Sequence, residues 1–224
     1  KAKFEISQII NQLKGDRIGL IVFAGSSHLY LPLTSDYEAT QLFLDAIDTK
    51  MIPNQGTDLS TAIRTAMNVF DEESDKYKVM VVVTDGEDHE GAAIELASTA
   101  LNSGIITHSV GVGTEKGSLI PVNDKSDNNR YKRDKKGILV TSKLNENMLI
   151  ELANAGGGIY SRFNNRDSKY KEILTAIEKM EKKSISTHIY TEFEDRYQGF
   201  ASISLLLLVL GLIMPTKKKK NDSD

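Results

Sequence analysis

The sequence predicts an α/β protein with a doubly wound, Rossmann-like and mostly parallel sheet, helices on both faces, and one C-terminal transmembrane helix. Three observations support this prediction. Continuous apolar runs, of which Lys78–Thr84 is the clearest, are typical of strands buried on both faces. Segments of helical periodicity alternate with these runs. Residues 197–216 carry no charge and are long enough, at about 1.5 Å per residue, to cross a bilayer core of roughly 30 Å.

Each element follows from its local pattern. A helix is expected from residue 1, because its apolar side chains fall on one side and Gly15 is a suitable end. Pro32 is tolerated in an edge strand, which assigns residues 29–33 to the edge of the sheet. The expected helices are 1–13, 37–47, 58–70, 91–102, 145–155 and 170–183. The expected strands are 17–24, 29–33, 78–84, 105–112 and 159–163.

The pattern also divides the chain into parts. A domain is expected over residues 1–183, with a surface insertion at about 113–143 that is rich in Gly, Asn, Asp and Lys. A connector over 184–196, the membrane helix over 197–216 and a basic then polar tail over 217–224 follow. Nothing upstream of the first helix caps it, so we expect that the segment preceding it is missing.

The flanks of the apolar stretch favour a spanning helix. Tyr197 precedes it and Lys217–Lys220 follow it, as interfacial anchors do. The positive-inside rule then places the lysine cluster in the cytoplasm and residues 1–196 on the other side of the membrane. The alternative is a buried helix of a soluble protein, since the strictly apolar part is only about 15 residues long.

The composition excludes several classes of function. The chain has no cysteine, and therefore no disulfide, thiolate metal site or cysteine nucleophile. The net charge is −3 at pH 7 for the whole chain and about −5 for residues 1–196, which argues against binding to nucleic acid or to anionic lipid. The four histidines are too scattered for a zinc cluster. His108 lies within an apolar strand, and we interpret it as a core histidine with satisfied hydrogen bonds.

Polar residues gather at three strand ends, where open α/β sheets bind ligands. Asn54–Ser60 is explained either by helix capping, through Thr57 or Asp58, or by ligand binding. Thr84–Gly91 holds four carboxylates, which repel one another unless a cation or solvent relieves them. Gly111–Gly117 matches a dinucleotide-binding loop only weakly, because no helix follows it.

Taken together, these motifs resemble a von Willebrand factor type A (VWA) domain over roughly residues 1–183. The Thr-Asp-Gly-Glu-Asp-His run, with a membrane helix after the domain, is most similar to the bacterial aerotolerance-type (Bat) membrane VWA proteins of the BatB/BatA kind. The segments that carry the resemblance are Gly15–Gly25, Pro32–Asp36, Gly56–Thr57, Val83–His89 and Gly111–Gly113.

The resemblance implies a metal-ion-dependent adhesion site (MIDAS) that holds Mg²⁺ or Mn²⁺. Thr57 and Asp85 match two of its ligands. The Asp-x-Ser-x-Ser segment at the end of the first strand is absent and is expected upstream of Lys1. We therefore expect this chain to lack a central strand, to bind the cation weakly and to be less stable than the complete domain. The residues expected on the rim of the site are Gly56, Asp58, Gly86, Glu87, Asp88 and His89.

The implied function is binding rather than catalysis. A protein ligand would complete the cation's shell with an Asp or Glu side chain, and the Bat resemblance implies an envelope complex linked to aerotolerance or stress. The domain would lie on the periplasmic side of the bacterial inner (cell) membrane. Two alternatives stay open: a Mg²⁺-dependent phosphohydrolase that uses the Asp85 loop, and a structural VWA subunit without metal. The first is disfavoured because Glu87 stands where an aspartyl-phosphate enzyme needs a second Asp.

Overall fold

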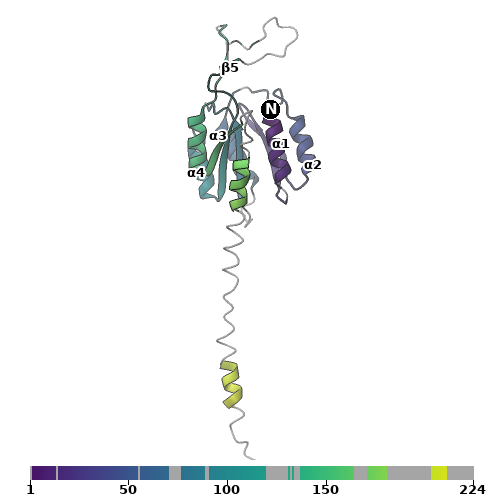
Figure 1. Ribbon diagram of the computed structural model, residues 1–224, viewed down its shortest axis with the longest axis vertical. Coiled ribbons are helices and arrows are strands. Elements are labelled where there is room, and N and C mark those ends of the chain that lie inside the picture. Colours follow the sequence, from purple (N-terminus) through teal and green to yellow (C-terminus); the bar gives the residue numbers. More distant parts are fainter. Residues whose placement is uncertain are drawn as a thin grey trace, which may run out of the picture. The chain divides into compact units, whose positions relative to one another are not determined.

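The computed structural model divides into two units, Lys1–Glu181 and Lys182–Asp224, which we describe separately (Figure 1). The residues described are 2–13, 15–54, 56–70, 77–88, 91–119, 131, 133, 137–163, 171–180 and 203–210.

Helices and strands alternate along the first unit much as the sequence predicts. The named helices are α1 (Ala2–Gln12), α2 (Tyr37–Ala46), α3 (Leu59–Val69), α4 (Ala93–Asn102) and α5 (Glu146–Ala155). The strands are β1 (Ile18–Phe23), β2 (Ser27–Thr34), β3 (Lys78–Thr84), β4 (Ile105–Gly111), β5 (Ser118–Leu119), β6 (Thr141–Ser142) and β7 (Gly157–Arg162). A further helix covers residues 171–180.

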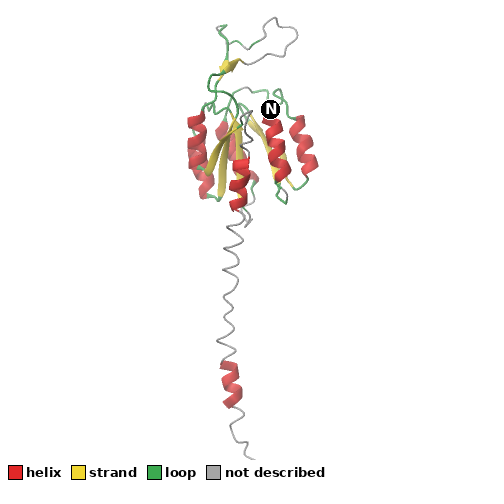
Figure 2. Ribbon diagram, viewed as in Figure 1, coloured by secondary structure: helices red, strands yellow, loops and turns green. Residues whose placement is uncertain are grey.

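The described strands form separate sheets rather than the single sheet expected (Figure 2). Strands β3, β4 and β7 make a parallel sheet with β4 in the middle. Strands β1 and β2 make an antiparallel pair, in which β2 carries Pro32. Within the described residues no strand joins β1 to β3, so each of these strands leaves one edge without a partner. Strands β5 and β6 form a short antiparallel pair within the 113–143 segment, which we call the hairpin.

Three of the described helices begin with a side-chain cap. The carboxylates of Asp36 and Asp58 accept backbone N–H groups at the starts of α2 and α3, and Asn145 does the same for α5. Such caps satisfy N–H groups that the first helical turn leaves without a partner. The capping interpretation of Asn54–Ser60 is therefore confirmed at Asp58.

Helices cover both faces of the parallel sheet. Met80 and Val82 of β3 pack with α3, α4 and α5 in one apolar cluster. Val81 and Val83 point to the opposite face and pack with α1 and helix 171–180 in a second cluster. This arrangement is the doubly wound α/β architecture that the alternating pattern predicts.

Strand β1 is less buried than its sequence suggests. All six of its residues, Ile-Gly-Leu-Ile-Val-Phe, are only half-buried. Ile21 and Phe23 still reach the cluster that contains Met80 and Val82. A continuous apolar run predicts a strand covered on both faces and both edges, and the unpaired edge of β1 accounts for its partial exposure.

In the second unit, residues 203–210 form a helix whose side chains are exposed. They are the central part of the 197–216 stretch, and the rest of that stretch lies outside the described residues. Among the helices that are described, none combines the length and the apolar character needed to cross a membrane.

Candidate metal-binding edge

Asp85 directly follows β3, and its carboxylate is oriented by several neutral donors. The Ser142 hydroxyl donates to Asp85 Oδ2 at 2.6 Å. The Thr84 hydroxyl and the Glu87 backbone N–H both donate to Oδ1 at 3.4 Å. The Asp85 side chain is half-buried, and within the described residues it has no ion pair, because both ion pairs there involve Arg162. A partly buried negative charge is thus held in place without a compensating positive charge.

The backbone around Asp85 is fixed by the start of α5. The Asn145 N–H donates to the Asp85 carbonyl oxygen at 2.8 Å. Gly86 has a φ of +79°, and a Cβ atom there would lie 2.6 Å from the Asn145 carbonyl oxygen. Only glycine fits this position, since both the conformation and the contact exclude a side chain. The Asp-Gly pair therefore aims the carboxylate and does more than make a turn.

Ser142 is a residue of this site that sequence reasoning missed. It lies 57 positions after Asp85, in the segment interpreted as a surface insertion. The hairpin of β5 and β6 returns the chain to the end of β3, and Leu144 is tied to Thr114 by a backbone hydrogen bond of 3.2 Å. No motif spacing signals this contact, because it depends on the path of the whole hairpin.

Thr57 lies in the loop that joins α2 to α3. The Asp58 N–H donates to the Ala24 carbonyl oxygen at 2.7 Å, and the Gly25 N–H donates to the Asn54 carbonyl oxygen at 3.0 Å. These bonds hold the loop against the end of β1. The Thr57 side chain is half-buried, and its hydroxyl makes no hydrogen bond within the described part of the chain. It is free to act as a ligand, whereas Asp58 is engaged as the cap of α3.

The expected rim residues fall into three groups. Gly86 is buried beneath α5, so it supports the loop and does not line a rim. Glu87, Asp88 and Asp58 are half-buried, and Gly56 is exposed with a φ of +137°. His89 lies outside the described residues.

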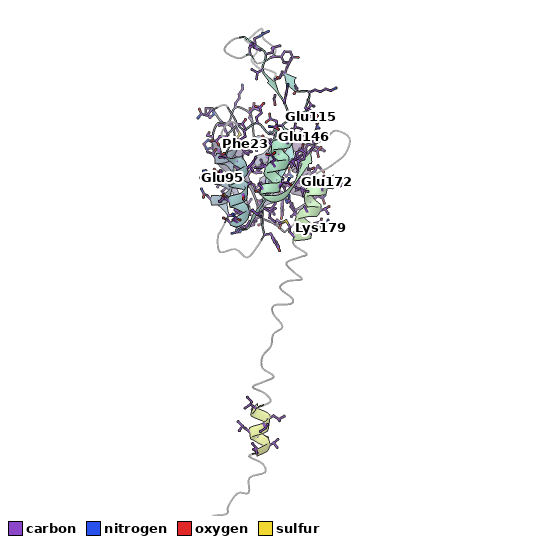
Figure 3. All side chains as sticks on the ribbon, turned by 90° about the vertical axis from the view of Figure 1, so that its left-hand side faces the viewer. Phe23, Glu95, Glu115, Glu146, Glu172 and Lys179 are labelled. Atoms are coloured by element: carbon purple, nitrogen blue, oxygen red, sulfur yellow. The ribbon has the colours of Figure 1, made fainter. Side chains whose placement is uncertain are left out.

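A charged cluster braces the loop after β4. Arg162 Nη1 lies 2.9 Å from Glu115 Oε1 and 2.8 Å from Glu146 Oε1, and the Tyr160 hydroxyl donates to Glu146 at 2.9 Å. Glu115 and Glu146 lie at the same end of the unit, next to the hairpin (Figure 3). Burial, followed by the hydrogen bond to Glu146, raises the pKa of the Tyr160 hydroxyl above its usual value. The cluster links β7 to the start of α5, and α5 in turn fixes Asp85.

The oxygen atoms at this edge are of the kind that a hard cation prefers, but the described side chains supply too few of them. Carboxylate and hydroxyl oxygens, as on Asp85, Thr57 and Ser142, are the ligands that Mg²⁺ prefers. No group of three or more His, Cys, Asp or Glu side chains able to hold a metal is found among the described residues. The described side chains therefore do not by themselves build a full shell.

Comparison with known proteins decides the family. The profile of the von Willebrand factor type A domain matches residues 1–87, which include both Thr57 and Asp85. The crystal structure of the conserved hypothetical protein BatB from Bacteroides thetaiotaomicron is 41% identical, with a TM-score of 0.76, over 81% of this chain and 87% of that chain. The chain belongs to the Bat-type VWA proteins.

Two further solved structures support the VWA fold. An aerotolerance-related membrane protein from Bacteroides fragilis is 39% identical, with a TM-score of 0.74, over 80% of this chain and 87% of that chain. Proximal thread matrix protein 1 from the mussel byssus, solved with a zinc-occupied MIDAS motif, shares the fold alone. It is 14% identical, with a TM-score of 0.53, over 80% of this chain and 38% of that chain.

This VWA chain spans 59% of the length of the curated relative that it matches, an uncharacterised protein of Borreliella burgdorferi. The two are 25% identical over 210 residues.

Proposed function

We propose that this VWA chain is a membrane-anchored protein-interaction module whose binding edge is built around Asp85 and Thr57. The uncompensated carboxylate of Asp85 carries this proposal. Four hydrogen bonds to its side chain and carbonyl oxygen orient it, and none of the described basic residues pairs with it. A half-buried carboxylate that is oriented but not neutralised is well suited to hold a cation.

Mg²⁺ or Mn²⁺ is the cation that this edge would hold in a complete site. When bound, it would supply positive charge to a carboxylate of the partner protein. Asp85 would contribute its carboxylate, Thr57 its free hydroxyl, and the Asp-x-Ser-x-Ser segment expected upstream of Lys1 the remaining ligands. Ser142 would keep the Asp85 carboxylate in position.

The family supports the proposed kind of partner, and the apolar C-terminal stretch of the sequence supports the proposed membrane anchor. The Bacteroides fragilis relative is an aerotolerance-related membrane protein, which favours a role in a bacterial envelope complex. Residues 197–216 would anchor the chain, with the VWA domain on the periplasmic side. The partner would be a protein that presents an Asp or Glu side chain.

A second candidate is a VWA scaffold that binds no metal, and one observation favours it. At 2.6 Å, the Ser142 hydroxyl already occupies Asp85 Oδ2 with a short, charge-assisted hydrogen bond. In this metal-free scaffold, Asp85 would hold the hairpin against the end of β3 and would bind no cation.

Titration with Mn²⁺ separates the two candidates. We would compare this chain with one that also carries the residues encoded before Lys1, and introduce Asp85→Asn into both. Asp36→Asn is the matched control, because it removes one carboxylate but retains a capping side chain at α2. The metal proposal expects saturable Mn²⁺ binding by the longer chain, weaker binding by this chain, and loss with Asp85→Asn only.

Equal Mn²⁺ affinity of the longer chain and its Asp85→Asn variant would overturn the metal site and favour the scaffold. Hydrolysis of a generic phosphate ester that is abolished by Asp85→Asn would instead show an enzyme. To test the partner chemistry, bound Mn²⁺ would be titrated with an Asp-containing peptide while the relaxation of water protons is measured. Displacement of bound water lowers the relaxation rate, and the matching Asn-containing peptide should leave it unchanged.

A further inference from the structure

His108 lies opposite an irregularity in β7. Thr107 of β4 pairs with Gly157, but Ser109 pairs with Tyr160, so two residues of β7 face the single residue His108. This is a β-bulge, which leaves a backbone group of the bulged strand out of the ladder. The Ile159 N–H donates instead to His108 Nδ1 at 3.0 Å. The bulge and the histidine therefore form one local unit.

This hydrogen bond fixes which nitrogen of His108 carries the proton. Nδ1 accepts, so in the neutral ring the proton is on Nε2, which is a donor. His108 is only 2% exposed, and Nε2 has no hydrogen-bond partner within the described part of the chain. Burial lowers the pKa of His108 to about 4, so the ring is neutral near pH 7. The expectation of a fully satisfied core histidine is therefore wrong at Nε2, which is an unmatched buried donor.

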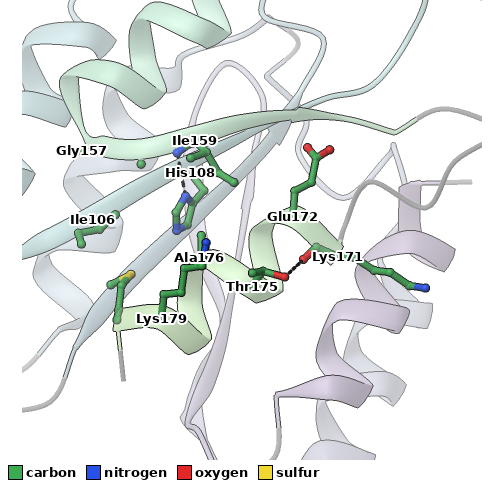
Figure 4. Close-up of a pocket in the computed structure, with 11 residues that line it drawn as sticks. Ile106, His108, Gly157, Ile159, Lys171, Glu172, Thr175, Ala176 and Lys179 are labelled. Carbon is green, nitrogen blue, oxygen red and sulfur yellow. Dashed lines mark hydrogen bonds between the residues drawn. The ribbon is translucent and has the colours of Figure 1, made fainter. Parts of the chain in front are cut away.

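The unmatched donor faces a cleft between β4, β7 and helix 171–180. The cleft has a volume of about 590 Å³, and His108, Ile106 and Ile159 line it from the sheet side. The residues that line it from the helix are Lys171, Glu172, Thr175, Ala176, Lys179 and Met180. In Figure 4 the side chain of Lys179 extends toward the imidazole of His108, while the labelled Glu172 and Lys171 point away from it. Lys179 has no acidic partner within the described residues.

His108 Nε2 and Lys179 are thus two donors on the same cleft, and the Glu172 carboxylate, which also lines it, points away from His108 (Figure 4). We propose that the cleft binds a small monocarboxylate with a short apolar tail. One carboxylate oxygen would accept from His108 Nε2–H, and the negative charge would pair with the Lys179 ammonium. The tail would lie along Ile106, Ile159 and Met180. The volume lies within the range of roughly 300–1,000 Å³ typical of small-molecule pockets, and leaves room for a tail beyond the carboxylate.

This site is independent of the Asp85 edge. Ile106 and Gly157 belong to the beginnings of β4 and β7, whereas Asp85 follows the end of β3. Its occupant would therefore be a ligand other than the proposed protein partner.

Calorimetric titration of the full chain with octanoate at pH 7 tests the proposal, with octanamide as the uncharged analogue. We expect saturable binding of octanoate, and weaker binding of octanamide by at least about tenfold. Lys179→Met should weaken octanoate binding by a similar factor. The matched control is Lys116→Met, which removes the same charge from an exposed loop that does not line the cleft and should change the affinity less than about twofold.

Nitrogen-15 NMR of the His108 ring supplies an independent readout. Addition of octanoate should shift the Nε2 resonance and leave Nδ1, which is bonded to Ile159, nearly unchanged. Equal binding of octanoate and octanamide, no effect of Lys179→Met, or a constant Nε2 resonance would each overturn the carboxylate site. Any of those results would mean that His108 Nε2 binds no ligand other than water.

Discussion

Replacing Gly158 with alanine should destabilise the domain through a direct collision between two strands. The φ angle of Gly158 is outside the left-handed region, so alanine brings no backbone strain of its own. Its Cβ atom would lie 2.2 Å from the Thr107 carbonyl oxygen and 2.8 Å from His108 Nδ1. Real Cβ contacts are essentially never under 3.0 Å, so β7 and β4 would have to separate by about 0.8 Å.

The loss in the free energy of unfolding depends on the atoms that the added Cβ would strike. The obstacle is backbone of β4, which is paired on its other edge with β3 and cannot rotate away as a side chain would. Overpacking typically costs about 1–3 kcal/mol, and a backbone obstacle places this variant at the upper end, near 3 kcal/mol. For a chain of this size, that corresponds to a loss of roughly 6–12 °C in melting temperature.

Urea and thermal unfolding of the full chain, followed by circular dichroism, would measure the effect. Gly104→Ala is the control, because Gly104 has a φ of +77° but nothing within 4 Å of an added Cβ. It should cost only about 1 kcal/mol, through backbone strain alone. If Gly158→Ala proves no more destabilising than Gly104→Ala, β7 does not approach β4 at Gly158 as closely as the structure shows.

Three more outcomes are expected. Ser142→Ala should lower the free energy of unfolding by about 1–2 kcal/mol, because it removes a charge-assisted hydrogen bond from a half-buried carboxylate; chemical denaturation would measure this, and an unchanged value would contradict it. Asp58→Ala should lower the free energy of unfolding by about 1 kcal/mol, because it removes the cap of α3. Thr57→Val should leave that free energy within about 0.5 kcal/mol of the parent value, because the Thr57 hydroxyl has no partner among the described residues. The burial that lowers the His108 pKa from 6.5 to about 4 predicts a loss of stability on acidification. His108 gains a proton below about pH 6.5 in the unfolded chain but only near pH 4 in the folded chain. The free energy of unfolding therefore falls between these pH values, by a total on the order of 3 kcal/mol. Urea titrations at pH 7 and pH 5 would detect this fall, with His108→Gln as the reference that lacks the contribution.

Local signals were enough to predict the elements of the domain. The apolar run 78–84 is a strand in the structure, in which Met80 and Val82 are buried and the other residues half-buried. The helix predicted over 58–70 is present over Leu59–Val69 with Asp58 as its cap. These features depend on periodicity and on side chains within one helical turn. The sequence contains that information directly, so the bounds of most elements agree to within one or two residues.

Contacts that depend on the path of the chain were not predictable in the same way. The motif pattern indicates Thr57 and Asp85, but not Ser142, whose contact needs a hairpin to return the chain across 57 positions. The apolar neighbours of His108 in the sequence correctly predict that its side chain is buried. These neighbours do not reveal the bulge in β7. The bulge decides which of the two ring nitrogens of His108 is left without a partner.

The open sheet edges and the short set of metal ligands have a common physical explanation. Strands β1 and β3 share one apolar cluster through Phe23 and Met80, yet each leaves an edge unpaired among the strands that the structure describes. A parallel strand between them would pair with both edges and cover the half-buried side chains of β1. Its carboxyl end would then lie beside the loops that begin at Ala24 and Asp85, where oxygen ligands are in short supply. We therefore expect metal affinity and thermal stability to rise together when that strand is supplied.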